Sequence, residues 1–205
     1  MTMRLHSLLR WTTLVLAVTP LVSCGPAPYD RPETTGLKGE DLFKHAEYLC
    51  LEQRWDEAIP MLKAFLVENP SHAGAHFYLG RCFMLSPEPW LAIAEGEFQT
   101  ALHFFIESGR KLPIQRFNAP SYFEMMCHIE TGKIYYEQVA KLIELRGDSP
   151  SSIRELIGKF QTATEEAKKA APDAPEVAQM EERLDELKQI ELSLPQHRDS
   201  KTYSI

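Results

Sequence analysis

The chain has 205 residues, of which 44% are hydrophobic and 25% are charged, and this is the composition of an ordinary globular protein. Its net charge of −7 argues against nucleic-acid binding, because that function needs a basic surface that neutralises phosphates. The sequence contains no run of 18 apolar residues, so we expect no membrane-spanning helix in the mature protein.

Residues 1–23 have the pattern of a secretory signal peptide. Arg4 and Arg10 precede an apolar run that is too short to span a bilayer permanently. The residues around the expected cut, LVSC from 21 to 24, resemble the lipobox of bacterial lipoproteins. This resemblance implies cleavage before Cys24 and acylation of that residue. Because Gly25 follows Cys24, the resemblance also implies that the protein is sorted to the outer membrane, where it would face the periplasm. The alternative is a plain secreted protein in which Cys24 is incidental.

Residues 24–38 are predicted to form a flexible tether between the acylated cysteine and the folded part. The segment is rich in proline and glycine and has few apolar residues. Several acyl chains would hold the protein stably on a bilayer. The negative charge of the chain does not suit a surface that lies flat on anionic lipid.

Residues 39–194 are predicted to form an all-α domain, because the apolar residues follow helical spacing and no segment alternates as a strand does. Asn69-Pro70 ends the second helix, Ser71 can cap the third, and Asp173-x-x-Glu176 fits a capping box for the last. The polar residues 195–205 are predicted to be a disordered tail. The expected helices are seven: Glu40–Glu52, Arg54–Glu68, His72–Leu85, Trp90–Ser108, Ser121–Arg146, one from about Ser152 to Ala171, and one from Asp173 to before Pro195.

A 34-residue period relates the first helical pair to the second. When position 1 is placed at Gly39, small residues fall at position 8 (Ala46) and position 20 (Ala58), and Pro70 falls at position 32. One period later, position 8 is Gly80. Small residues at these positions allow two helices to approach closely, and bulky residues between them fill the remaining space.

This pattern resembles the tetratricopeptide repeat. The resemblance is strong over the first unit, moderate over the second, which has about nine inserted residues, and loose over a third unit that ends near Pro172. It covers about two-thirds of the chain. His45 and Phe65 depart from the usual residues of the motif. The resemblance implies antiparallel helical hairpins stacked as a short solenoid; the alternative is an irregular helical bundle.

The same resemblance implies that the first helices of the pairs line a concave, protein-binding face. Within each helix, the binding residues share one side because they lie at i, i+4 and i+7. This face lacks the clustered Lys and Arg residues of a carboxylate-binding groove, so a free C-terminal tail is not the expected ligand. The predicted protein-binding residues are Phe43, Glu47, Phe77, Arg81, Met84, Lys133 and Tyr136, with Leu51 and Leu85 at the end of the same helices.

No catalytic site, metal site or cofactor is predicted. The sequence contains no HExxH, GxSxG or phosphate-loop motif. His72 and His76 are four residues apart, a spacing that can hold a metal, but both occupy ordinary repeat positions. His45, His103 and His128 are single histidines for which packing or hydrogen bonding is the expected role.

Three cysteines remain after Cys24. Cys50 and Cys82 are 32 residues apart, close to one repeat period, so they should lie on neighbouring helices at a similar height. In an oxidising compartment they form a candidate disulfide if their Cα atoms lie within about 7 Å. The alternative is two buried thiols that behave as small apolar side chains. Cys127 would then be left free.

Three hypotheses for function follow. The first is a lipid-anchored periplasmic adaptor that binds an envelope protein or peptide segment and serves in the assembly of an envelope machine. The second is a structural envelope lipoprotein without a specific ligand, which a fully polar binding face would support. The third is a small helical hydrolase that uses His and Glu, and it requires a closed cluster of polar residues. The oligomeric state is left open.

Overall fold

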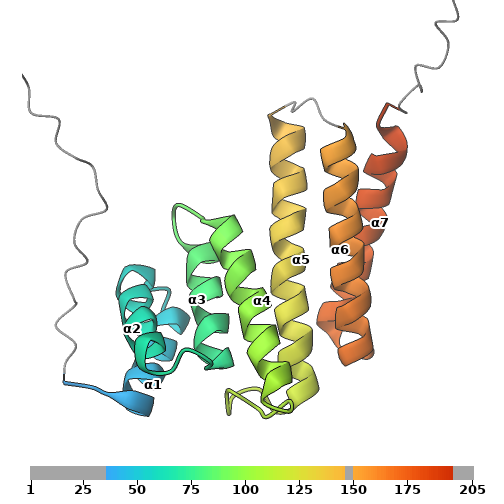
Figure 1. The fold of residues 1–205 in the computed structure, drawn as a ribbon. Helices are drawn as coiled ribbons and strands as arrows, with labels where there is room; N and C mark the ends of the chain where they lie inside the picture. The colour runs from blue at the N-terminus through green and yellow to red at the C-terminus, as the bar shows by residue number, and fades with distance from the viewer. Residues whose placement is uncertain (1–35, 146–149, 196–205) are drawn as a thin grey trace, which may run out of the picture. The chain divides into compact units, whose positions relative to one another are not determined.

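The computed structural model describes residues 36–145 and 150–195, and all regular secondary structure within them is helical (Figure 1). The predicted all-α fold class with about seven helices is confirmed. The signal peptide, Cys24 and all but the last few residues of the predicted tether lie outside the described residues. The helices are α1 (Gly39–Leu51), α2 (Trp55–Glu68), α3 (Ala73–Leu85), α4 (Leu91–Glu107), α5 (Pro120–Glu144), α6 (Pro150–Ala170) and α7 (Pro175–Ser193).

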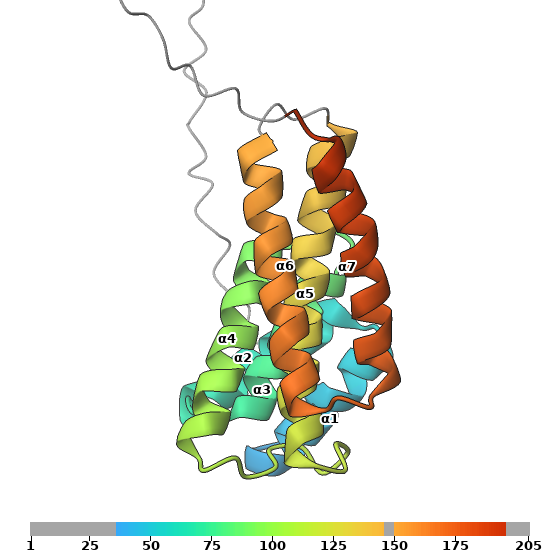
Figure 2. The same cartoon turned by 90° about the vertical axis from the view of Figure 1, so that its right-hand side faces the viewer.

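The helices pack as antiparallel hairpins in chain order, so that each helix contacts the next one along the sequence. The odd-numbered helices also contact one another: α1 packs on α3, α3 on α5 and α5 on α7. The even-numbered helices of the described chain make no such contacts with one another. We call these two sets the odd layer and the even layer; Figure 2 shows α7 and α6 at opposite sides of α5. This is the stacked arrangement that the 34-residue period predicts.

Small residues lie where helices of a pair meet. Ala46 and Ala58 are fully buried, in agreement with positions 8 and 20 of the repeat. At Gly80, an added Cβ would lie 2.9 Å from the ring of Phe98, so only glycine allows α3 and α4 to approach this closely.

The buried side chains form two clusters. The first involves α1 to α4, residues of α5 between Phe123 and Ile134, and the α4–α5 loop, which contributes Ile114 and Phe117. The second is built by α5, α6 and α7. Helix α5 contributes to both clusters, with Phe123 in the first and Met125 in the second. This 25-residue helix therefore joins the first two hairpins to α6 and α7.

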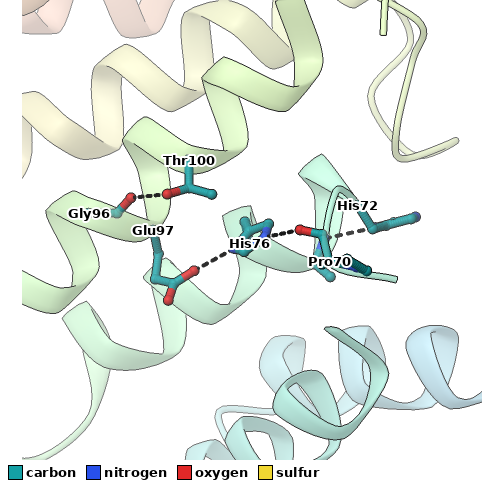
Figure 3. A network of polar contacts seen from close by, with 7 residues as sticks. Pro70, His72, His76, Gly96, Glu97 and Thr100 are labelled. Atoms are coloured by element: carbon teal, nitrogen blue, oxygen red, sulfur yellow. Dashed lines mark hydrogen bonds and ion pairs between the residues drawn. The ribbon is translucent and has the colours of Figure 1, made fainter. Parts of the chain in front are cut away.

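Two histidines at the start of α3 have opposite electrostatic roles (Figure 3). The Nδ1 of His72 accepts a hydrogen bond from the backbone N–H of Ala75 and so caps the helix. Both ring nitrogens of His76 face acceptors, at 2.7 Å from the carboxylate of Glu97 and at 2.8 Å from the carbonyl of Pro70. His72 is therefore held neutral and His76 is suited to carry a proton.

The pKa directions agree with this geometry. Burial lowers the pKa of His72, although the charge of Glu40 acts in the opposite direction. For His76, burial also acts to lower the pKa, but the hydrogen bonds that its ring donates to Glu97 and to the carbonyl of Pro70 outweigh burial, and the net pKa is raised.

Two predicted helix starts are wrong in detail. The N-cap of α3 is His72 and not Ser71, because the imidazole nitrogen replaces a hydroxyl as the acceptor. Helix α7 begins at Pro175 after Ala174, and no side chain caps it, so Asp173 and Glu176 do not form a capping box. The Glu176 carboxylate instead accepts a hydrogen bond from Tyr122 on α5 at 2.8 Å.

Among the described residues, no helix is long and apolar enough to cross a membrane.

Candidate protein-binding groove

The odd layer carries a hollow of about 500 Å³ between α3, α5 and α7, which we call the odd-layer groove. Its apolar lining comes from the end of α3, the α3–α4 turn, the start of α4 and the second half of α5. These apolar residues are Met84, Leu85, Pro89, Leu91 and Ala140. Leu85 is 42% exposed, so a large apolar side chain on this surface is accessible to a partner.

Charged side chains form the rest of the lining. Lys133 and Lys141 on α5 and Arg183 on α7 are basic, while Glu137 and Glu144 on α5 are acidic. These residues interleave along α5 at helical spacing, so positive and negative groups alternate beside the apolar surface. Apolar side chains beside charged groups are typical of a surface that binds another protein.

A smaller hollow of about 230 Å³ adjoins the groove at Leu85. It lies between α1 and α3 and is also lined by Cys50, Leu51, Trp55 and Arg81. Leu51 is 40% exposed and occupies the same repeat position as Leu85. The exposed apolar residues at the ends of α1 and α3 therefore extend the accessible surface along the odd layer.

Arg81 and Lys133, two of the predicted binding residues, flank a buried carboxylate. Glu130 is 2% exposed, and its Oε1 lies 3.2 Å from the Nζ of Lys133 and 3.8 Å from the Nε of Arg81. The Oε2 of Glu130 and the Nε of Arg81 make no hydrogen bond to any described residue. A buried carboxylate needs cations nearby, so both side chains have a structural role besides their place at the hollows.

Tyr136 lies at the contact between α5 and α7 and not in the open groove. The guanidinium of Arg183 is 5.2 Å from the centre of its ring, and its hydroxyl donates a long hydrogen bond of 3.4 Å to Glu186. The ring also contacts Phe160 on α6. Tyr136 therefore holds Arg183 at the edge of the groove by a cation–π contact.

Phe43 and Phe77 were predicted as groove residues, and this is wrong because both are core residues. Phe43 is 3% exposed and packs on Phe65, His72 and Tyr78. Phe77 is fully buried; the α4–α5 loop covers it with Phe117, and the rings of Phe98 and Phe123 complete its surroundings. Neither ring is accessible to a ligand.

Glu47 is half-buried at the contact between α1 and α3. Its carboxylate accepts a hydrogen bond of 2.6 Å from the hydroxyl of Tyr78. Burial, together with the hydrogen bond to Glu47, raises the pKa of Tyr78 well above its usual range. Phe43, Glu47 and Cys50 do share one side of α1, as their spacing predicts, but this side faces α3.

A third hollow, of about 280 Å³, lies between α4, α5 and α6 on the other side of α5. His128, Tyr135 and Glu166 are among its lining residues, so this hollow holds both residue types that the hydrolase hypothesis requires. Burial lowers the pKa of His128. The hydroxyl of Tyr135 is hydrogen-bonded to Glu95 at 2.7 Å, and Glu166 forms an ion pair with Lys169. Two polar residues of this hollow, Tyr135 and Glu166, therefore already interact with other residues of the fold.

Sequence reasoning missed Lys141, Arg183 and Leu91. Lys141 and Arg183 lie beyond the first helices of the two regular repeat units, and Leu91 starts a second helix that the repeat pattern assigns to the opposite side. Only Lys141 could have been predicted from the sequence: Glu137 and Lys141 follow the predicted binding residue Lys133 at intervals of four residues, so all three lie on the same side of a helix.

In comparisons with known proteins, no family model, no curated protein and no solved structure matches the chain. The tetratricopeptide and lipoprotein resemblances therefore remain predictions from the sequence.

Proposed function

We propose that the chain is an adaptor that binds a segment of another protein in the odd-layer groove. The observation that supports this best is the hollow of about 500 Å³ in which accessible apolar side chains lie beside alternating charges. Hydrophobic anchors give affinity at such surfaces, and charged groups beside them give orientation and selectivity. The proposed role is binding without catalysis.

The lining defines the chemistry of the partner segment. Met84, Leu85 and Leu91 suit one or two bulky apolar side chains. Lys141 and Arg183 suit acidic groups at one side of these anchors. The partner is therefore expected to be an extended or helical segment in which apolar residues alternate with charges of both signs.

The proposed location rests on the resemblance of residues 21–24 to a lipobox. Acylation of Cys24 would anchor the protein in the outer membrane, facing the periplasm. The partner would then be another envelope protein, and the adaptor would serve the assembly of an envelope machine. Contact with the membrane would be made through the lipid anchor.

Site-specific photo-crosslinking tests the binding proposal. A photoreactive residue at Leu85 in the groove is compared with one at Val67, an 82% exposed residue of α2 in the even layer. We expect position 85 to crosslink one defined envelope protein that position 67 does not. If both positions crosslink the same set of proteins, or if position 85 crosslinks none, the groove is not the binding surface.

Lipid labelling tests the anchor separately. Cells that express the full chain incorporate labelled palmitate into it, and a Cys24→Ala variant should incorporate none and leave the membrane fraction. Labelling that persists in this variant would show that Cys24 is not the acylated residue.

A further inference from the structure

We propose that Cys50 on α1 and Cys82 on α3 form an intramolecular disulfide when the chain meets an external disulfide oxidant. This inference does not depend on what the odd-layer groove binds. It would add a covalent link between the first and second helical hairpins, at the point where two odd helices meet.

The geometry brings the two thiols together before any bond forms. Their Sγ atoms are 2.7 Å apart, and both cysteines are present as free thiols. The sulfur atoms of a disulfide are about 2.0 Å apart, so the bond requires only a small further approach. The Sγ of Cys50 is also 3.9 Å from the carbonyl of Tyr78, one turn before Cys82 on α3.

The surrounding contacts hold α1 and α3 in this register. The hydroxyl of Tyr78 donates its 2.6 Å hydrogen bond to Glu47, one turn before Cys50 on α1, and the ring of Phe43 packs on the same tyrosine. Three successive residues on one side of α1 therefore contact one side of α3. Because these contacts fix the two helices, the thiols cannot move apart without opening the α1–α3 contact.

The two cysteines differ in how an oxidant reaches them. Cys50 is 5% exposed and lines the smaller hollow, whereas Cys82 is fully buried. Its contact with Cys50 and its burial both raise the pKa of the Cys82 thiol. Cys50 is therefore the residue expected to react first, either through the hollow or before α1 has docked.

The reaction is thiol–disulfide exchange with an external disulfide, R–S–S–R. The Cys50 thiolate attacks one sulfur of the oxidant, forms a Cys50–S–R mixed disulfide and releases one thiolate, RS⁻. Cys82 then loses its proton to water, and its thiolate attacks the Cys50 sulfur and expels the second RS⁻. Two electrons pass from the protein thiols to the oxidant, and the two RS⁻ ions take up from water the two protons that Cys50 and Cys82 have lost, which gives two molecules of RSH.

Trypsin cleavage places each cysteine in a different peptide, so the disulfide pairing can be identified from the linked peptides. Cys50 lies in the peptide His45–Arg54, Cys82 in Cys82–Arg110, and Cys127 in Phe117–Lys133, while Cys24 lies in a fourth peptide. Cys127 is a buried internal control, because it is also a free thiol but has no cysteine beside it in the described structure.

The experiment refolds the reduced full chain in a buffer of oxidised and reduced glutathione, alkylates free thiols under denaturing conditions and identifies peptides by mass spectrometry. We expect the peptide pair His45–Arg54 and Cys82–Arg110 linked with the loss of two hydrogen atoms, and Cys127 alkylated. The proposal is overturned if Cys50 and Cys82 are both alkylated, if they carry only glutathione, or if either pairs with Cys127.

Thermal unfolding provides a second readout. The oxidised chain should unfold at a temperature about 4–15 °C higher than the reduced chain. A Cys127→Ala variant should keep this difference, and a Cys50→Ala/Cys82→Ala variant should lose it. The same difference in the double variant would place the oxidation elsewhere and contradict the proposal.

Discussion

Replacement of Gly80 by alanine tests whether α3 and α4 are packed as closely as the repeat requires. An added Cβ at Gly80 would lie 2.9–3.1 Å from three ring atoms of Phe98. Phe98 is fully buried and packs against Phe77, so its ring has little room to move. A matched control exists at Gly158 on α6, where an added Cβ meets nothing within 4 Å.

The expected magnitude comes from two opposing effects. Alanine in the middle of a helix is about 0.8–1.0 kcal/mol more favourable than glycine. Overpacking a buried site costs about 1–3 kcal/mol. At Gly158 only the first effect operates, so Gly158→Ala should stabilise the protein by roughly 0.4–1 kcal/mol. Gly80→Ala should therefore be about 1–3 kcal/mol less stable than Gly158→Ala.

The free energy of unfolding of each variant is measured by urea denaturation, followed by the circular dichroism of the helices. Gly132→Ala provides an intermediate case, because the added Cβ would meet the terminal methyl of Met180, which is the end of a flexible side chain. Equal stabilisation by Gly80→Ala and Gly158→Ala would refute the close approach of α3 and α4.

Three further predictions concern the core and the polar contacts. Phe77→Ala should lower the free energy of unfolding by about 3–5 kcal/mol, and a loss below 1 kcal/mol in denaturant titration would contradict its placement in the core. Tyr78→Phe removes the hydrogen bond to Glu47 and should cost about 0.5–1.5 kcal/mol in the same assay, with a smaller effect expected in a Glu47→Ala background, where only the interaction of the hydroxyl with Arg116 remains to be lost. Because the pKa of His76 is raised in the folded state, its contribution to stability should be fully present below about pH 6.5 and be lost as the pH rises through the folded-state pKa. Denaturation of wild type and His76→Gln at pH 5.5 and pH 8.5 measures this, and a wild-type advantage that grows with pH would contradict the sign.

Helical periodicity was sufficient to predict the fold class. The small residues Ala46, Ala58 and Gly80 lie at contacts between helices because the 34-residue period places them there. Helix starts were less predictable: the imidazole of His72 caps α3, although N-cap propensity favours the preceding serine.

The binding face was predicted only in part. Helical spacing correctly groups Phe43 with Glu47 and Cys50, but it cannot show that α3 covers this group. Phe77 is covered by a loop of irregular sequence, whose path no periodicity indicates. Leu51 and Leu85, the last residues of α1 and α3, are 40% and 42% exposed, whereas Met84 lines the groove although it is only 9% exposed.

The affinity of the odd-layer groove for the partner segment that crosslinks at position 85 tests the central claim most directly. Calorimetry compares wild type with Leu85→Lys and with Val67→Lys, which places the same charge on an exposed apolar position of the even layer. We predict at least a roughly tenfold loss of affinity for Leu85→Lys and wild-type affinity for Val67→Lys. Equal affinity of all three proteins, or an equal loss in both variants, would contradict binding in the groove.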